Sequence, residues 1–168
     1  MIHVCSLARL HATVEETGAQ HVVTLLKQTD RVERPESVAE ANHLILGMDD
    51  IATPMDGYVL PADDHVARLI AFVQRWERTR PMVVHCFAGI SRSTAGAFVA
   101  ACALNPRRDE QAIAWAIRRA SATASPNPRI VAIADRMLGR DGRMIGAVDA
   151  IGRGAMAYEA SPFRLDLE

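Results

Sequence analysis

Residues 81–94 read PMVVHCFAGISRST, and the arrangement of the whole chain can be worked out from them. Their apolar run Met82–Val84 is typical of a buried strand, and the following segment Ala95–Leu104 is apolar over enough residues for a buried helix. A strand, a tight loop and a helix start form an anion site, because free backbone N–H groups and the helix dipole both favour negative charge. The sequence therefore predicts an anion-binding loop between this strand and this helix.

The loop carries a thiol and a guanidinium at a spacing that suits phosphate. Cys86 and Arg92 are six positions apart, so the chain between them can wrap a tetrahedral oxyanion with the thiol below the phosphorus. The planar guanidinium can bind two oxygens of such an anion. Gly89 allows a positive φ or a close backbone approach inside the loop. These features predict phosphate chemistry at Cys86.

At these residues the chain resembles a known family. His85–Thr94 matches the His-Cys-x-x-Gly-x-x-Arg-Ser/Thr signature of cysteine-dependent protein tyrosine phosphatases, and its Ala-Gly-Ile-Ser-Arg-Ser core is most similar to the dual-specificity branch. The resemblance covers roughly residues 22–138 and is dense only near the signature. It implies a single phosphatase domain over residues 1–168, with residues 139–168 as a C-terminal extension. It also implies a small stand-alone bacterial member of the family.

The resemblance implies a role for each part of the signature. Cys86 would be the nucleophile, and the loop amides, the helix N-terminus and Arg92 would favour its thiolate. Attack on phosphorus would give a phosphocysteine that water hydrolyses, while Arg92 and the amides hold the equatorial oxygens. The phosphate-binding loop would consist of Cys86, Phe87, Ala88, Gly89, Ile90, Ser91 and Arg92.

Three further residues have supporting roles in the family. His85 would orient the loop and tune the thiol, which is nearly the same physical statement as a core histidine bonded to backbone. Ser93 would stabilise the leaving thiolate, or would be an ordinary serine in the first turn of a helix. The turn Ser125-Pro126-Asn127 resembles one whose Asn braces the catalytic loop, although the same tripeptide is also a common turn.

The leaving oxygen needs a proton, and three aspartates in one loop are candidates for the general acid. In dual-specificity phosphatases the acid lies just past a strand, some thirty-odd residues before the cysteine. Asp50, which is 36 positions before Cys86, matches that place best, and Asp49 is the runner-up. Asp56 is the third candidate. At least two of the three must be exposed loop residues without a catalytic role.

Composition narrows the remaining classes of function. A net charge of −1 implies no general attraction to nucleic acid or to an anionic membrane. The three cysteines, Cys5, Cys86 and Cys102, form no Cys-x-x-Cys pair and favour a reducing compartment. The scattered histidines show no metal-ligand spacing, so neither a metal nor another cofactor is expected. The N-terminus shows no signal peptide and the chain no apolar span, which predicts a cytoplasmic protein.

Hydrophobic patterning predicts an α/β fold in three layers, with a small, mostly parallel or mixed sheet flanked by helices on both sides, as in phosphotyrosine protein phosphatases. The expected strands are Ile2–Leu7, His21–Leu26, His43–Leu46 and Met82–Val84. The expected helices are Ala12–Gly18, Asp63–Arg80, Arg92–Leu104, Asp109–Ala120, Arg129–Leu138 and Asp141–Ile151. The tail Met156–Glu168 is expected to run extended along the surface.

The predicted function is hydrolysis of a phosphorylated protein or small phosphomonoester. The loop has no lysine to hold extra phosphates, which favours a singly phosphorylated group. No tyrosine-recognition segment deepens the pocket, so phosphotyrosine is expected first, with phosphoserine and phosphothreonine as further substrates. A non-catalytic pseudophosphatase is the alternative. A sulfur transferase or arsenate reductase fits less well, because His85 and the Cys-to-Arg span argue against it and neither Cys5 nor Cys102 is obviously placed as a resolving cysteine.

Overall fold

The computed structural model describes residues 1–167, and its centre is a five-stranded mixed sheet in the order β3-β2-β4-β1-β5. The strands are β1 (Ile2–Ser6), β2 (His21–Leu26), β3 (His43–Gly47), β4 (Met82–Cys86) and β5 (Phe163–Leu165). The first four run parallel, and β5 pairs antiparallel with β1. This arrangement confirms the predicted α/β fold.

Six α-helices surround the sheet within the described residues. They are α1 (Leu10–Thr17), α2 (Asp63–Arg75), α3 (Arg92–Leu104), α4 (Glu110–Ala120), α5 (Pro128–Met137) and α6 (Arg143–Ile151), with short 3-10 turns η1 (Leu7–Arg9) and η2 (Glu40–Asn42). Helix α3 is buried from Arg92 to Cys102, which explains why its sequence is apolar on every side. Capping side chains of Asp109 and Asn127 begin α4 and α5.

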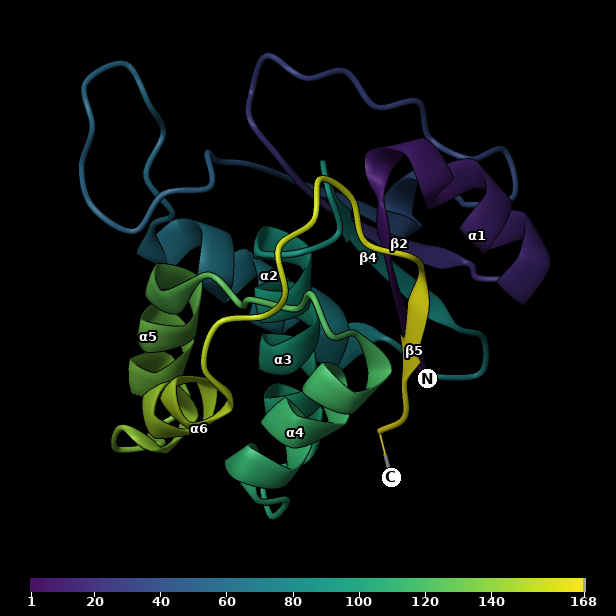
Figure 1. Cartoon of the computed structure of the whole chain (residues 1–168). Coiled ribbons are helices and arrows are strands. Elements are labelled where there is room, and N and C mark those ends of the chain that lie inside the picture. The colour runs from purple at the N-terminus through teal and green to yellow at the C-terminus, as the bar shows by residue number, and fades with distance from the viewer. Residues whose placement is uncertain (168) are drawn as a thin grey trace.

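The two faces of the sheet carry separate cores. Helix α1 covers one face with a small cluster that includes Cys5, Val22 and Val83. The other helices form the large core on the opposite face, where β4 contributes Val84 and Cys86 (Figure 1). Because side chains alternate along a strand, neighbours such as His85 and Cys86 face opposite layers.

The structure corrects three expected elements. Helix α1 begins at Leu10 and follows η1, so it starts earlier than predicted. Helix α2 ends at Arg75 and not at Arg80, because Trp76 is already extended and its ring Nε1–H donates to the Arg80 carbonyl, 3.0 Å away. The tail, expected on the surface, supplies the edge strand β5. Glu168, the last residue of that predicted tail, lies outside the described residues.

The parallel strands bring their carboxyl ends to one edge of the sheet. Strand β4 ends at Cys86, β1 ends beside it at Ser6, and β3 ends at Gly47 just before the aspartate loop. In open α/β sheets this is the edge at which ligands bind. The fold therefore places the predicted anion loop and the candidate acids at the same edge.

Candidate active site

The loop after β4 turns its carbonyl groups outward. The carbonyl oxygens of Phe87, Ala88, Ile90 and Ser91 accept hydrogen bonds of 2.9 to 3.2 Å from the backbone N–H groups of Leu7, Ala160, Ser125 and Asn127, respectively. In a trans peptide unit the N–H points away from the C=O. The amide N–H groups that follow these carbonyls therefore face the inside of the loop, where they form a concave donor surface suited to an anion.

Gly89 is required where it stands for two reasons. Its φ is +75°, in the region that favours glycine. A Cβ at this position would also come within 2.9 Å of the backbone carbon of Cys5 and 3.0 Å of the nitrogen of Ser6. The loop thus lies directly against the end of β1, and a side chain at this position would push it away.

Cys86 lies at the start of this loop with its thiol next to a serine hydroxyl. Its Sγ is 3.1 Å from Ser93 Oγ in the first turn of α3, and both residues are buried. Burial raises the pKa of both other cysteines, Cys5 and Cys102, to about 12. Cys5 belongs to the core on the opposite face of the sheet, so it is not positioned to form a disulfide with Cys86.

The Arg92 guanidinium is held in place but only partly used. Its Nη1 donates to the Met48 carbonyl at 2.8 Å, at the start of the aspartate loop. Its Nε is buried and has no hydrogen-bond partner among residues 1–167. A buried N–H without a partner carries a desolvation cost, and a bound oxyanion would remove it. The structure thus brings Cys86, Ser93 and Arg92 to one loop, as the sequence predicted.

His85 lies under the loop in a relay of side chains that the sequence did not reveal. Its Nε2 is 2.7 Å from Thr24 Oγ1 on β2, and that hydroxyl is 2.8 Å from His43 Nε2 on β3. Its Nδ1 is 3.3 Å from the Cys86 carbonyl oxygen. Burial is the main cause that lowers the pKa of His85 to about 4, so the ring is neutral near pH 7.

The three candidate acids occupy different places. Asp50 reaches the anion loop, where its Oδ1 accepts a hydrogen bond from Ser91 Oγ at 2.7 Å. Asp49 closes its own loop instead, because its Oδ2 accepts from the Val59 N–H at 2.7 Å and its N–H donates to the Val59 carbonyl. Asp56 is exposed near the tip of that loop. Only Asp50 of the three is thus bonded to the anion loop within residues 1–167.

Asn127 joins three parts of the site. Its side-chain amide donates to Asp50 Oδ1 at 2.8 Å and to the Ile51 carbonyl at 3.2 Å. Its backbone N–H donates to the Ser91 carbonyl, and its Oδ1 accepts from two N–H groups at the start of α5. Asn127 therefore links the aspartate loop, the anion loop and a helix start, which is a bracing geometry.

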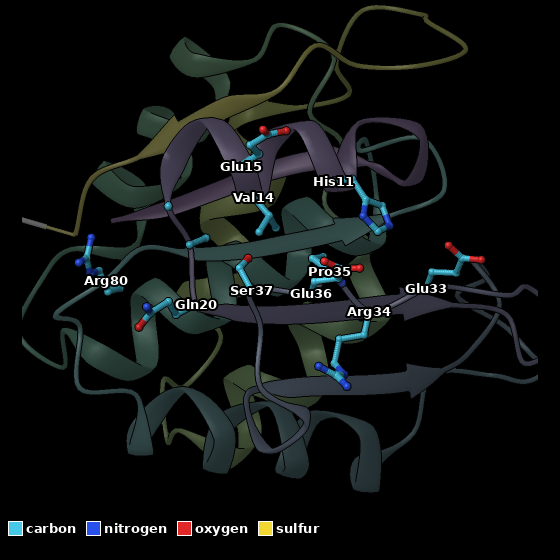
Figure 2. A pocket seen from close by; sticks show the side chains of 12 residues that line it. His11, Val14, Glu15, Gln20, Glu33, Arg34, Pro35, Glu36, Ser37 and Arg80 are labelled. Carbon is cyan, nitrogen blue, oxygen red and sulfur yellow. The ribbon is translucent and has the colours of Figure 1, made fainter.

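A cavity of about 800 Å³ lies away from this site. It is bounded by α1 and the segment around residues 33–37 (Figure 2). Its lining mixes acidic residues such as Glu15 and Glu33 with basic ones such as Arg34, and no cysteine lines it. Within residues 1–167 no helix is long and apolar enough to cross a membrane, and no group of three metal-binding side chains is present.

Comparison with known proteins agrees with this geometry. The family model described as protein-tyrosine phosphatase matches residues 49–121, which include Asp50 and the whole anion loop. A search of curated protein sequences finds no match.

Solved structures share the fold. Human DUSP28 superposes with a TM-score of 0.64 at 17% identity, covering 83% of this chain and 88% of that chain. DUSP15 gives 0.62 at 16% identity, covering 89% of both chains. The human tyrosine phosphatase-like serine/threonine/tyrosine-interacting protein gives 0.63 at 14% identity, covering 83% of this chain and 92% of that chain. These structures confirm the predicted fold, and the family-model match over residues 49–121 supports the resemblance to protein tyrosine phosphatases.

Proposed function

We propose that this chain, which resembles dual-specificity-like protein tyrosine phosphatases, hydrolyses phosphomonoesters through a phosphocysteine intermediate. The observation that carries the proposal is the loop of inward amides that joins the Cys86 thiol to the partly unpaired Arg92 guanidinium. Such a loop suits the transition state of phosphoryl transfer, because catalysis of this transfer is mainly positioning and electrostatic stabilisation.

The first step is displacement at phosphorus. The Cys86 thiolate attacks, the sulfur–phosphorus bond forms, and the bond from phosphorus to the leaving oxygen breaks. Asp50 gives that oxygen its proton, and the hydrogen bonds from Ser91 and Asn127 hold the carboxyl group beside the loop. Arg92 and the loop amides hold the three remaining oxygens.

The second step returns the enzyme. Water attacks phosphorus, Asp50 takes a proton from it, and the sulfur leaves as thiolate. The Ser93 hydroxyl is 3.1 Å from that sulfur and can donate a hydrogen bond to it. His85 and Asn127 act as positioning residues, the first below Cys86 and the second between the aspartate loop and the anion loop.

The substrates that fit best are phosphorylated proteins, with phosphotyrosine first and phosphoserine or phosphothreonine as further substrates. In support, the residues between Cys86 and Arg92 carry no positive side chain that would hold extra phosphates. The three free cysteines support a reducing, cytoplasmic compartment. We assign residues 1–168 to one domain, and the bacterial source stays a prediction.

The test compares paired aspartates on paired leaving groups. With phosphotyrosine peptide, whose phenolate leaves poorly, Asp50→Asn should lower kcat by about 10²–10⁴-fold, the usual worth of a general acid. With p-nitrophenyl phosphate, whose phenol is acidic, the loss should be smaller. Asp49→Asn is the matched control, and its loss of kcat relative to wild type should be the same for both leaving groups.

Two results would count against the proposal. Wild-type protein without turnover on either substrate would make the chain a pseudophosphatase, the second candidate that the similarity to a phosphatase-like interacting protein keeps in view. Cys86→Ser should abolish turnover while phosphate still binds to the amides and Arg92, so residual turnover above a few per cent would require another nucleophile.

A further inference from the structure

After α6 the chain returns to the anion loop. We call residues 152–160 the C-terminal strap, which runs from α6 to β5 and is yellow in Figure 1. The Gly154 N–H donates a hydrogen bond to Ser125 Oγ at 2.9 Å, and the Ala155 N–H donates to the Ala122 carbonyl oxygen at 2.8 Å. At its far end the Ala160 N–H donates to the anion-loop carbonyl of Ala88. The strap is thus bonded to the phosphate loop itself.

Gly154 of the strap packs closely against the backbone of Thr123. A Cβ on Gly154 would lie 2.5 Å from the carbonyl carbon of Thr123 and 2.6 Å from its oxygen. These atoms belong to backbone, which has no flexible side chain to move aside. The position of the strap therefore depends on the absence of a side chain at residue 154.

The strap encloses a cavity of about 330 Å³ beside the phosphate loop. Residues 153–157 form one wall, and Asp50, Ser91 and Asn127 are on the other side. Ser91 belongs to the anion loop and Asp50 is the proposed acid. The cavity therefore lies beside the anion loop and the proposed acid.

Arg153 supplies the positive charge of this cavity. No other lysine, arginine or histidine lines it. Its side chain is exposed and makes no hydrogen bond or ion pair within residues 1–167, whereas the nearby Arg118 side chain donates to three backbone carbonyls. The Asp50 carboxylate in the same cavity already accepts two hydrogen bonds at one oxygen. Arg153 is thus the charged group of the cavity that is available to a ligand.

We propose that the C-terminal strap is a substrate-recognition element in which Arg153 binds a second anionic group of a phosphopeptide. The group is an acidic side chain or a second phosphate close in sequence to the phosphorylated residue. The inference rests on the proposed function, in which the anion loop holds the first phosphate. A guanidinium fork matches either group.

The experiment scans one glutamate through a glutamine-flanked phosphotyrosine peptide and measures kcat/KM at each position. In the wild type one position near the phosphotyrosine should raise kcat/KM by about 5- to 10-fold, the range between an exposed ion pair and a charge-assisted hydrogen bond. The gain should shrink with added salt. Arg153→Gln should remove it, and Arg153→Glu should favour lysine at that position instead.

Matched controls separate recognition from folding and chemistry. Turnover of p-nitrophenyl phosphate, which has no flanking residue, should be unchanged in both Arg153 variants. Arg119→Glu alters another exposed, unpaired arginine on α4 and should keep the preference. Gly154→Ala should displace the strap and lose the preference, whereas Gly146→Ala, where a Cβ meets nothing within 4 Å, should keep it.

A second arm identifies the source of the anion. Replacing the preferred glutamate by phosphoserine should raise kcat/KM further if a second phosphate is the natural group, and should not if a carboxylate is. No preferred position, or a preference that Arg153→Gln leaves intact, would overturn the proposal. Peptide binding to Cys86→Ser repeats the scan without turnover, so the recognition proposal and the phosphatase proposal can fail separately.

Discussion

The neutral imidazole of His85 leads us to predict that the protein loses stability in acid by an amount that can be calculated. The pKa of His85 is lowered from 6.5 to about 4, with burial as the largest cause. Between these two pH values the unfolded chain holds a proton on His85 that the folded protein does not, so the free energy of unfolding falls as the pH is lowered. At about 1.4 kcal/mol per pH unit the full loss is about 3 kcal/mol, a large part of the 5–15 kcal/mol of a typical domain.

The assay is urea unfolding of wild type and His85→Gln at pH 7, 6, 5 and 4. The buried Trp76 provides a fluorescence signal. Glutamine does not titrate, so the free energy of unfolding of the His85→Gln variant should fall less than that of wild type. Between pH 7 and pH 4 the two decreases should differ by about 3 kcal/mol. Histidines with lowered pKa outside this relay, His21 and His65, are present in both proteins and cancel in the comparison.

Parallel pH curves for the two proteins would refute this prediction, because they would mean that the pKa of His85 is the same in the folded and unfolded states. A lower stability of the glutamine variant at pH 7 would not matter, since the prediction concerns the slope. Thr24→Val gives an independent check: it leaves the imidazole nitrogen of His85 without its 2.7 Å partner and should cost about 1–3 kcal/mol at pH 7.

Two more predictions follow from the site. Arg92→Lys should lower kcat/KM by about 10²–10³-fold in a phosphatase assay, because a point charge cannot both hold the Met48 carbonyl and clamp phosphate; near wild-type kinetics would remove Arg92 from the mechanism. Iodoacetamide at pH 7 should alkylate Cys86 first in peptide mass mapping, because burial raises the pKa of Cys5 and Cys102 to about 12. Earlier labelling of Cys5 or Cys102 would contradict the proposed reactivity.

The sequence predicted the parts of the site that lie in one strand–loop–helix unit. Cys86, Ser93 and Arg92 are brought together by local geometry, so a motif with fixed spacing was sufficient to place them. Asp50 lies in another loop, and the strand before it predicted its approach. The distinction from Asp49 depends on two long-range partners, Ser91 and Asn127, which no spacing along the chain reveals.

The parts that sequence could not predict depend on pairing between distant segments. The contact of Thr24 with His85 requires β2 to lie beside β4 in a particular register, which follows from the whole sheet. The strap has neither helical nor strand periodicity over its length, so its sequence was typical of a surface tail. Its place at the site follows from the pairing of β5 with β1, which brings the chain back across the loop.

The anion loop shows why apolar residues are suitable for a phosphate site. Phe87, Ala88 and Ile90 have no side-chain group that could bind phosphate, yet their carbonyl groups are held outward by three separate segments of the chain. Each outward carbonyl fixes the next amide N–H inward, so the binding surface is made of backbone. Side chains at these positions are then free to serve another purpose. Phe87, 62% exposed beside the strap residue Tyr158, presents an apolar surface next to the site, and Arg153 lines the cavity at the other end of the strap. The chemistry thus depends on a short motif, whereas the surroundings that a substrate meets depend on residues far from it in the sequence.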